Sequence, residues 1–271
     1  MIIFILSCII LLLALSLAIN DRNNREIIKS LNIKINNLKH LIPIKTPTCL
    51  DGVFEIHISV DPEDNYVKLL NYARQNQESK GMKVVYAVSS NKNNQYMISY
   101  FTRKNDDKIA VENALKIANE LEDLNIKVLR VKVEGHGVNG TPMSKEEYDN
   151  IKIYLLDKYD NKCGTPYFEF HVKISNRESN TLCYETLEND VNIFESKDKF
   201  VAVSHNICSV TKHPLLTMRV YDTGFIEAQE FKDYVMNNLK EKGYIFGDAI
   251  QQEFSIYDTY SQLDAGWIGY K

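Results

Sequence analysis

Two segments of the chain repeat one order of residue types, and each carries an acid and an imidazole two residues apart. They are Phe54-Glu55-Ile56-His57-Ile58 and Phe168-Glu169-Phe170-His171-Val172, which lie 114 residues apart. Alternation of apolar and polar residues is typical of a half-buried strand, whose successive side chains point to opposite faces. Each segment is therefore predicted to turn its Glu and His to one face, where an imidazole can transfer protons and a carboxylate can orient it.

The elements that follow the two segments come in the same order, which indicates an internal duplication. The first repeat is predicted as strand 53–60, helix 61–79, strands 82–88 and 96–102, helix 106–124 and strand 127–134. The second is predicted as strand 167–174, helix 178–189, strands 200–204 and 215–221, helix 226–242 and a strand ending at 257. The order βαββαβ is that of ferredoxin-like domains, so we predict an α+β protein with tandem ferredoxin-like repeats.

In a ferredoxin-like unit the strand order is 4-1-3-2, and the helices cover only one face of the sheet. Alternation along the strands then assigns a set of polar residues to the free faces. They are Glu55, His57, Ser59, Arg130, Lys132 and Glu134 in the first repeat, and Glu169, His171, Lys173, Arg219 and Glu253 in the second. If the two free faces oppose each other they form a polar cleft. The alternative is a solvated face stabilised by cross-strand pairs such as Glu55 with Lys132.

Phosphoester cleavage is the chemistry that we favour for this cleft. His57-Ile58-Ser59-Val60 resembles the His-x-Ser/Thr-apolar strand motif of the two-histidine phosphoesterases. That resemblance implies that His57 and His171 act as base and acid, and that the Ser59 hydroxyl holds a phosphate oxygen. The second copy departs from the motif, because Lys173 stands in place of the hydroxyl, although lysine also binds phosphate as a point charge. Glu55 and Glu169 would orient the imidazoles. The other predicted ligand contacts are Arg130, Lys132, Glu134 and Arg219.

Two other functions remain open. A divalent metal held by the two Glu-x-His pairs is ranked below phosphate, because the nearby basic residues would compete for the carboxylates, and we assign no metal ligand. The vicinal oxygen chelate proteins build such sites from paired modules, but in the order βαβββ. The second alternative is a binding module without chemistry, which recognises an anionic small molecule or a partner. No cofactor is assigned.

The N-terminus carries the signals of a membrane protein. Residues 2–19 contain no charged side chain and are just long enough to cross a bilayer. The alternative is a cleaved signal peptide with Ser16-Leu17-Ala18 as its site. Residues 21–48 carry six basic and two acidic residues, a net charge of +4. We therefore predict a single-pass anchor, a basic segment that attracts anionic lipid, and a cytoplasmic body.

The composition of the body excludes several classes of protein. It carries 26 Lys and Arg against 34 Asp and Glu, a net charge of −8, which argues against general nucleic-acid binding. The five cysteines form no Cys-x-x-Cys pair, so neither a disulfide framework nor a zinc site is predicted. Abundant Asn, Ile, Lys and Tyr are typical of an AT-rich genome, such as that of a protist or a large DNA virus. The predicted divisions are an anchor (1–20), a basic segment (21–48), repeat one (49–143), a linker helix (144–162), repeat two (163–257) and a tail (258–271).

Several further residues are predicted to lie outside the chemistry or at its edge. His136, between two glycines, is read as part of a turn, in preference to a loop that brings it to the rim of the cleft, and His213 is read as loop. Ser204-His205-Asn206 follows a strand and could reach the cleft. The segment 257–268 is read as a tail that covers the core, in preference to one that brings Asp258 or Asp264 to the cleft. With Arg130-x-Lys132-x-Glu134 and Glu169-x-His171-x-Lys173, this tail resembles an uncharacterised family of proteins from bacteria and large DNA viruses. The resemblance spans roughly 54–268 and implies no reaction.

Overall fold

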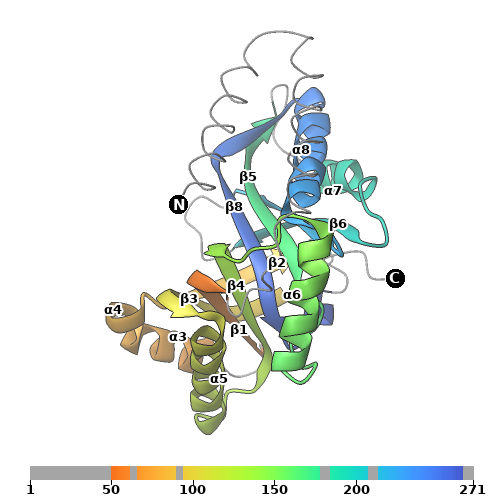
Figure 1. The fold of residues 1–271 in the computed structure, drawn as a ribbon. Coiled ribbons are helices and arrows are strands. Elements are labelled where there is room, and N and C mark those ends of the chain that lie inside the picture. Colours follow the sequence, from red (N-terminus) through yellow and green to blue (C-terminus); the bar gives the residue numbers. More distant parts are fainter. Residues whose placement is uncertain (1–49, 62–65, 90–93, 178–183, 207–212, 265–271) are drawn as a thin grey trace. The chain divides into compact units, whose positions relative to one another are not determined.

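The computed structural model of the chain describes residues 50–61, 66–89, 94–177, 184–206 and 213–264. These residues form an α+β fold in which the order βαββαβ occurs twice (Figure 1). The first repeat comprises β1 (Asp51–Val60), α3 (Tyr66–Gln75), α4 (Gln77–Lys80), β2 (Lys83–Ser89), β3 (Asn94–Asp106), α5 (Asp107–Asp123) and β4 (Val128–Asn139). Helix α6 (Lys145–Lys158) leads to β5 (Tyr167–Arg177), α7 (Tyr184–Asn192), β6 (Lys199–Asn206), β7 (Leu215–Tyr221), α8 (Phe225–Glu241), β8 (Tyr244–Asp258) and the 3-10 turn η1 (Ser261–Asp264).

The eight described strands close into one antiparallel barrel in the order β1-β3-β2-β6-β7-β5-β8-β4. Each repeat contributes the predicted order 4-1-3-2, as β4-β1-β3-β2 and as β8-β5-β7-β6. Two seams join the repeats. The β2–β6 seam consists of three residue pairs, from Ala87↔Asn206 to Ser89↔Ser204, and the β4–β8 seam shifts register between Val133 and Glu134. The two free sheet faces are therefore the inner wall of a single barrel.

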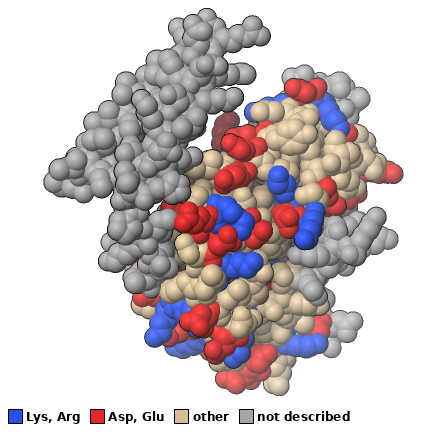
Figure 2. Space-filling view, turned by 45° about the vertical axis from the view of Figure 1, so that its right-hand side comes forward, with Lys and Arg blue, Asp and Glu red and all other residues tan. Residues whose placement is uncertain are grey.

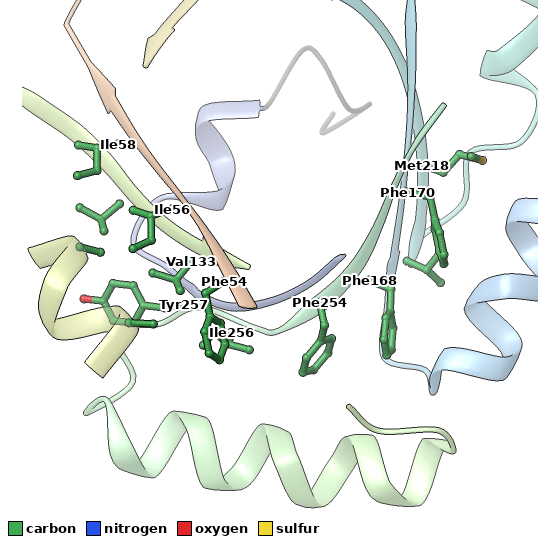
Figure 3. Close-up of a cluster of buried hydrophobic side chains, with 14 of the residues drawn as sticks. Phe54, Ile56, Ile58, Val133, Phe168, Phe170, Met218, Phe254, Ile256 and Tyr257 are labelled. Atoms are coloured by element: carbon green, nitrogen blue, oxygen red, sulfur yellow. The ribbon is translucent and has the colours of Figure 1, made fainter. Parts of the chain in front are cut away.

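The apolar core lies between the outer wall of the barrel and the helices. Phe54, Ile56 and Ile58 of β1 are buried there, as are Phe168 and Phe170 of β5. Figure 3 shows these side chains pointing away from the barrel interior. Helices α5, α6 and α8 contribute the buried residues that meet them. Since burying such a side chain contributes about 1.5–3 kcal/mol, this core fixes which face of each strand turns inward.

Local sequence signals explain where the helices begin. The Ser144 hydroxyl accepts a hydrogen bond from the Glu147 amide, and the Glu147 carboxylate accepts one from the Ser144 amide, which completes a capping box at α6. Asp106 caps α5 by accepting from the amide of Ile109. The predicted helix over 61–79 is divided at Asn76 into α3 and α4, and its residues 62–65 lie outside the described part.

One predicted boundary is wrong. Gly135 and its neighbours were expected to end the strand, yet β4 continues to Asn139, and His136 pairs with Val53 of β1. Glycine is required here for space, because a Cβ at position 135 would lie 2.8 Å from both methyl groups of Val138. Gly137 has a φ of +55°, in the left-handed region that glycine tolerates. The two glycines therefore bend and continue the strand.

The predicted membrane anchor and basic segment, residues 2–48, lie outside the described residues, as do Trp267 and Ile268 of the tail. Among the helices of the described part, none is long and apolar enough to span a bilayer. The anchor and the boundaries of the six predicted divisions stay predictions.

Candidate functional site

A cavity of about 380 Å³ lies inside the barrel. Its wall includes every residue that alternation assigned to the free faces: Glu55, His57, Ser59, Arg130, Lys132, Glu134, Glu169, His171, Lys173, Arg219 and Glu253. Alternation in the sequence therefore assigned these side chains to the correct face of the strands, the one that lines the cavity. Acidic and basic side chains are also interleaved on the molecular surface shown in Figure 2, so charge of one sign does not dominate it.

The strand register brings four buried glutamates together in an arrangement that repeats between the two halves. Glu55 of β1 pairs with Glu134 of β4, and Glu169 of β5 pairs with Glu253 of β8. All four side chains are at most 3% exposed. Burying four carboxylates destabilises the fold unless each gains compensating charge or hydrogen bonds. A sheet face with only a structural role would therefore not be expected to bury so many.

The buried cations are already paired. Arg130 donates to both oxygens of Asp258, from Nε at 2.8 Å and from Nη2 at 2.5 Å. Arg219 Nε donates to Glu169 Oε2 at 2.6 Å. Lys132 Nζ lies 2.6 Å from Glu134 Oε1 and 3.0 Å from Glu169 Oε1. The suggested Glu55–Lys132 pair is therefore replaced by contacts of Lys132 with two other glutamates.

Asp258 and Tyr167 complete the Arg130 contact. The Tyr167 hydroxyl donates to Asp258 Oδ2 at 2.8 Å, and its ring lies 4.2 Å from the Arg219 guanidinium carbon. Asp258, which was predicted to belong to a covering tail, is instead the last residue of β8 and 2% exposed. It neutralises Arg130 and does not reach the wall of the cavity.

His136 contacts two glutamates of the site, contrary to its prediction as part of a turn, although it is not itself among the residues that line the cavity. Its Nε2 lies 2.9 Å from Glu253 Oε1 and 3.3 Å from Glu55 Oε2. Burial would lower the pKa of His136, but the contacts with Glu253 and Glu55 raise it to about 9. The alternation Arg130, Lys132, Glu134 already placed residue 136 on the inner face. Because Gly135 and Gly137 were taken to end the strand, the alternation was not extended to His136.

Gln251 and Ser99, which sequence reasoning also missed, hold the carboxylates in place. Gln251 Nε2 donates to Glu55 Oε2 at 2.8 Å and to Glu253 Oε1 at 2.5 Å, so one amide brings two carboxylates from different repeats together. Ser99 donates to Glu55 Oε1. Burial would raise the pKa of Glu55, but His136, His57 and Ser99 lower it to about 2. Alternation along β8 from Glu253 would have indicated Gln251.

The two predicted catalytic histidines differ in their surroundings. His171 Nε2 lies 3.0 Å from Glu169 Oε1 and 3.2 Å from Glu253 Oε2, and its Nδ1 shares a hydrogen bond with Thr217 Oγ1 at 2.9 Å. Burial would lower the pKa of His171, but the two glutamates raise it to about 10. His57 Nε2 lies 3.4 Å from Glu134 Oε2 and 3.8 Å from Glu55 Oε1. The buried Nδ1 of His57 has no hydrogen-bond partner among the described residues.

Two groups of side chains have the spacing of metal ligands, and they share Glu253. The donor atoms of Glu55, His57 and Glu253 all lie within 4.8 Å of one another, and so do those of Glu169, His171 and Glu253. His136 lies beside the first group, with its buried Nε2 2.9 Å from Glu253 Oε1 and 3.3 Å from Glu55 Oε2.

The charge of the interior also favours a cation. In the described part, this network buries the carboxylates of Glu55, Glu134, Glu169, Glu253 and Asp258 against the buried cations Arg130, Lys132 and Arg219, and the exposed Lys83 lies 3.5 Å from Glu55. If every carboxylate is ionised, negative charges remain in excess. Protons on histidines offset them in the absence of other cations, which is why the pKa values of His136 and His171 are raised.

The remaining candidates lie farther along the wall. Ser204, Asn206 and His213 line the cavity, so the strand end near 204–206 reaches the site as suggested, and His213 joins it from the segment before β7. His205 is not among the lining residues.

Comparisons with known proteins give few relatives. No protein family and no curated protein matches the sequence. Among solved structures, chlorite dismutase from Candidatus Nitrospira defluvii in complex with imidazole shares 11% identity at a TM-score of 0.26, covering 80% of this chain and 94% of that one. The siroheme decarboxylase NirDL in complex with an iron-uroporphyrin III analogue shares 10% identity at a TM-score of 0.25, covering 86% of this chain and 85% of that one. TM-scores this low support no functional argument.

Proposed function

We propose that the barrel interior binds one divalent transition-metal ion through Glu55, His57, His136 and Glu253, and that this metal serves chemistry in the adjoining cavity. The observation that carries the proposal is that donor atoms of Glu55, His57 and Glu253 lie within 4.8 Å of one another, and that His136 Nε2 contacts two of these residues, Glu55 at 3.3 Å and Glu253 at 2.9 Å. Two nitrogen and two oxygen donors suit Mn²⁺, Fe²⁺, Co²⁺ or Zn²⁺. A divalent ion would also offset the excess of negative charge that protons on the histidines offset in its absence.

The first of the two Glu-His-Glu groups is the better site. In the second, Glu169 is already contacted by Lys132 at 3.0 Å and by Arg219 at 2.6 Å, and these cations would repel a metal ion. In the first, Gln251 and Ser99 are neutral donors that orient Glu55, and the one cation near it, Lys83, lies farther away at 3.5 Å and is 57% exposed. Such supporting hydrogen bonds are typical around metal ligands.

Phosphate binding between His57 and His171, which the sequence favoured, is less well supported. Both imidazoles have a nitrogen within 4.8 Å of a Glu253 oxygen, so a phosphate placed between them would meet that carboxylate. Arg130, Lys132 and Arg219, which were expected to neutralise the phosphate, are each paired with an acid. Without a metal, the repulsion between phosphate and these glutamates disfavours the complex.

The place of His171 indicates a catalytic role beside the metal. It contacts the shared Glu253 at 3.2 Å, and Glu169 and Thr217 fix its ring. With its pKa raised to about 10 in the metal-free protein, it is protonated at neutral pH, and a metal on Glu253 would lower that pKa toward the range of a general acid. On an ion that takes six ligands, such as Mn²⁺, Fe²⁺ or Co²⁺, four protein ligands would leave open positions for a substrate or water in the cavity.

The test is metal binding by the full chain in detergent. After chelator treatment, Co²⁺ and Zn²⁺ are titrated into the wild type and into His136→Gln, while the Co²⁺ absorption spectrum reports nitrogen and oxygen ligation. We expect His136→Gln to weaken affinity by about 10- to 100-fold. His213→Gln, which alters a histidine on the same cavity wall but outside the cluster, serves as the matched control and should bind as the wild type does. Equal affinity in His136→Gln, His57→Gln and the wild type would overturn the proposal.

A further inference from the structure

The cavity has two chemically different sides. The four glutamates stand on β1, β4, β5 and β8. The part of the wall formed by β2, β6 and β7 contains no acidic residue among the described residues. Its members are Val85, Ala87, Ser204, Asn206 and Leu215, together with Lys83, Thr217 and Arg219, which contact Glu55, His171 and Glu169 of the acidic side. A ligand that spans the cavity would thus meet the metal cluster at one end and hydrogen-bond donors with apolar side chains at the other.

Lys173 is a cation at the end of the cavity that lies away from the four glutamates. It lies two residues beyond His171 on β5 and pairs with Leu215 of β7, which in turn pairs with Ser204 of β6. Directly paired residues share a face, so Lys173, Leu215 and Ser204 form a row across three strands. Four residues of strand, about 13 Å, separate Lys173 from Glu169. Lys173 is exposed at the edge of the cavity, and within the described part it has no carboxylate at ion-pair distance, unlike the four other Lys and Arg residues of the wall.

We infer that the substrate is a small organic oxyanion, whose anionic group binds Lys173 and Ser204 while another oxygen reaches the metal. This inference rests on the proposed function, because the metal is what neutralises the glutamates. Val85, Met97 and Leu215 are apolar residues of the wall that a short carbon skeleton could contact. A volume of about 380 Å³ fits a small molecule. The anionic group is a carboxylate or a phosphate, which share this chemistry.

The experiment uses the full chain in detergent, loaded with Co²⁺. The cobalt absorption spectrum is followed while 2-hydroxybutanoate is added in one arm and inorganic phosphate in the other. Lys173→Gln removes the charge at the far end, and Lys240→Gln removes one from an exposed position on α8 outside the barrel. We expect Lys173→Gln to weaken the response to one of the two anions by about tenfold. Its affinity for Co²⁺ should not change, and Lys240→Gln should behave as the wild type does.

The outcomes separate the two proposals. A cobalt spectrum that responds to neither anion, or that responds equally in Lys173→Gln and the wild type, overturns the oxyanion inference and leaves the metal site standing. Failure to bind Co²⁺ overturns the proposed function, and the inference falls with it. The arm whose affinity drops in Lys173→Gln shows whether the anionic group is a carboxylate or a phosphate.

Discussion

At the scale of residues, the site is a set of titratable groups whose charges depend on one another. Glu55 and Glu253 have lowered pKa values, because His136 contacts both and overcomes the effect of burial. Glu134 has a raised pKa, because burial and the nearby Glu253 disfavour its charge. Such displaced pKa values cluster at functional sites more often than on ordinary sheet faces.

Metal affinity should therefore depend on pH. A metal that binds His136 must displace its proton, and the pKa of that imidazole is about 9 in the metal-free protein. We expect the apparent dissociation constant for Zn²⁺ to fall by about tenfold per pH unit from pH 6.5 to 8.5, with release of at least one proton per metal. Titration calorimetry in two buffers of different ionisation enthalpy measures both quantities. A dissociation constant that does not change with pH would contradict His136 as a ligand.

The stability of the metal-free protein should also change with pH. In the unfolded chain His136 and His171 have the usual histidine pKa of 6.5. In the folded protein the pKa values are about 9 and 10, so folding favours the protonated imidazoles. That contribution is fully present below pH 6.5 and is lost as the pH rises through 9 to 10. Urea unfolding at pH 7 and pH 10 should give a lower free energy of unfolding at pH 10. His171→Gln should show a smaller difference between the two pH values than the wild type.

At the scale of elements, short local signals set the positions of the strands and helices that carry the site. The β4 strand delivers Arg130, Lys132, Glu134 and His136 to the interior, and it does so only because Gly135 leaves room for Val138. Helix α6 connects the repeats and starts at the Ser144 capping box.

Gly135→Ala should disturb both stability and metal binding. The new methyl group would lie 2.8 Å from the Val138 methyls, so the strand must shift next to His136. We expect a loss of about 1–3 kcal/mol in the free energy of unfolding and a weaker affinity for Zn²⁺. Gly247→Ala is the control, because its Cβ would meet its nearest neighbour at an ordinary 3.5 Å. Recovery of both properties in Gly135→Ala with Val138→Ala would confirm that the cause is this contact.

Ser144→Ala should weaken the start of α6 without reaching the site. Loss of the cap leaves the Glu147 amide without its acceptor, which costs about 1 kcal/mol of stability. Ser79→Ala, at an exposed position in the last turn of α4, should change stability by less than about 0.5 kcal/mol. Urea unfolding of both variants measures the difference. An equal effect of the two substitutions would show that the capping box does not stabilise α6.

At the scale of the whole molecule, closure of the barrel is what turns two sheet faces into an interior. Arg130 comes from the first repeat, and Tyr167 and Asp258 come from the second, so their buried contacts tie the repeats together beside the β4–β8 seam. The metal cluster likewise combines Glu55, His57 and His136 of one repeat with Glu253 of the other.

Asp258→Ala should therefore destabilise the barrel as a unit. It leaves the guanidinium of Arg130 buried without its carboxylate, a loss of about 3–5 kcal/mol. Asp233→Ala removes an acid that pairs with Lys232 but is 62% exposed, and should cost no more than about 1 kcal/mol. Chemical unfolding followed by tyrosine fluorescence compares the two. If Asp258→Ala unfolds no more easily than Asp233→Ala, the Arg130 contact does not hold the repeats together.

The sequence by itself determined the two repeats, the strand order within each, and the inward direction of Glu55, His57, Glu169 and His171. It could do so because alternation and helical periodicity are local properties that burial of the apolar face enforces. The ion pairs of Arg130, Lys132 and Arg219 with acidic residues became visible only in the tertiary structure. The same is true of the contacts that His136 and Gln251 make with Glu55 and Glu253. Those contacts depend on the register across the seams between the repeats and on the glycines that carry β4 past residue 134. Such long-range geometry leaves no periodic trace in the chain.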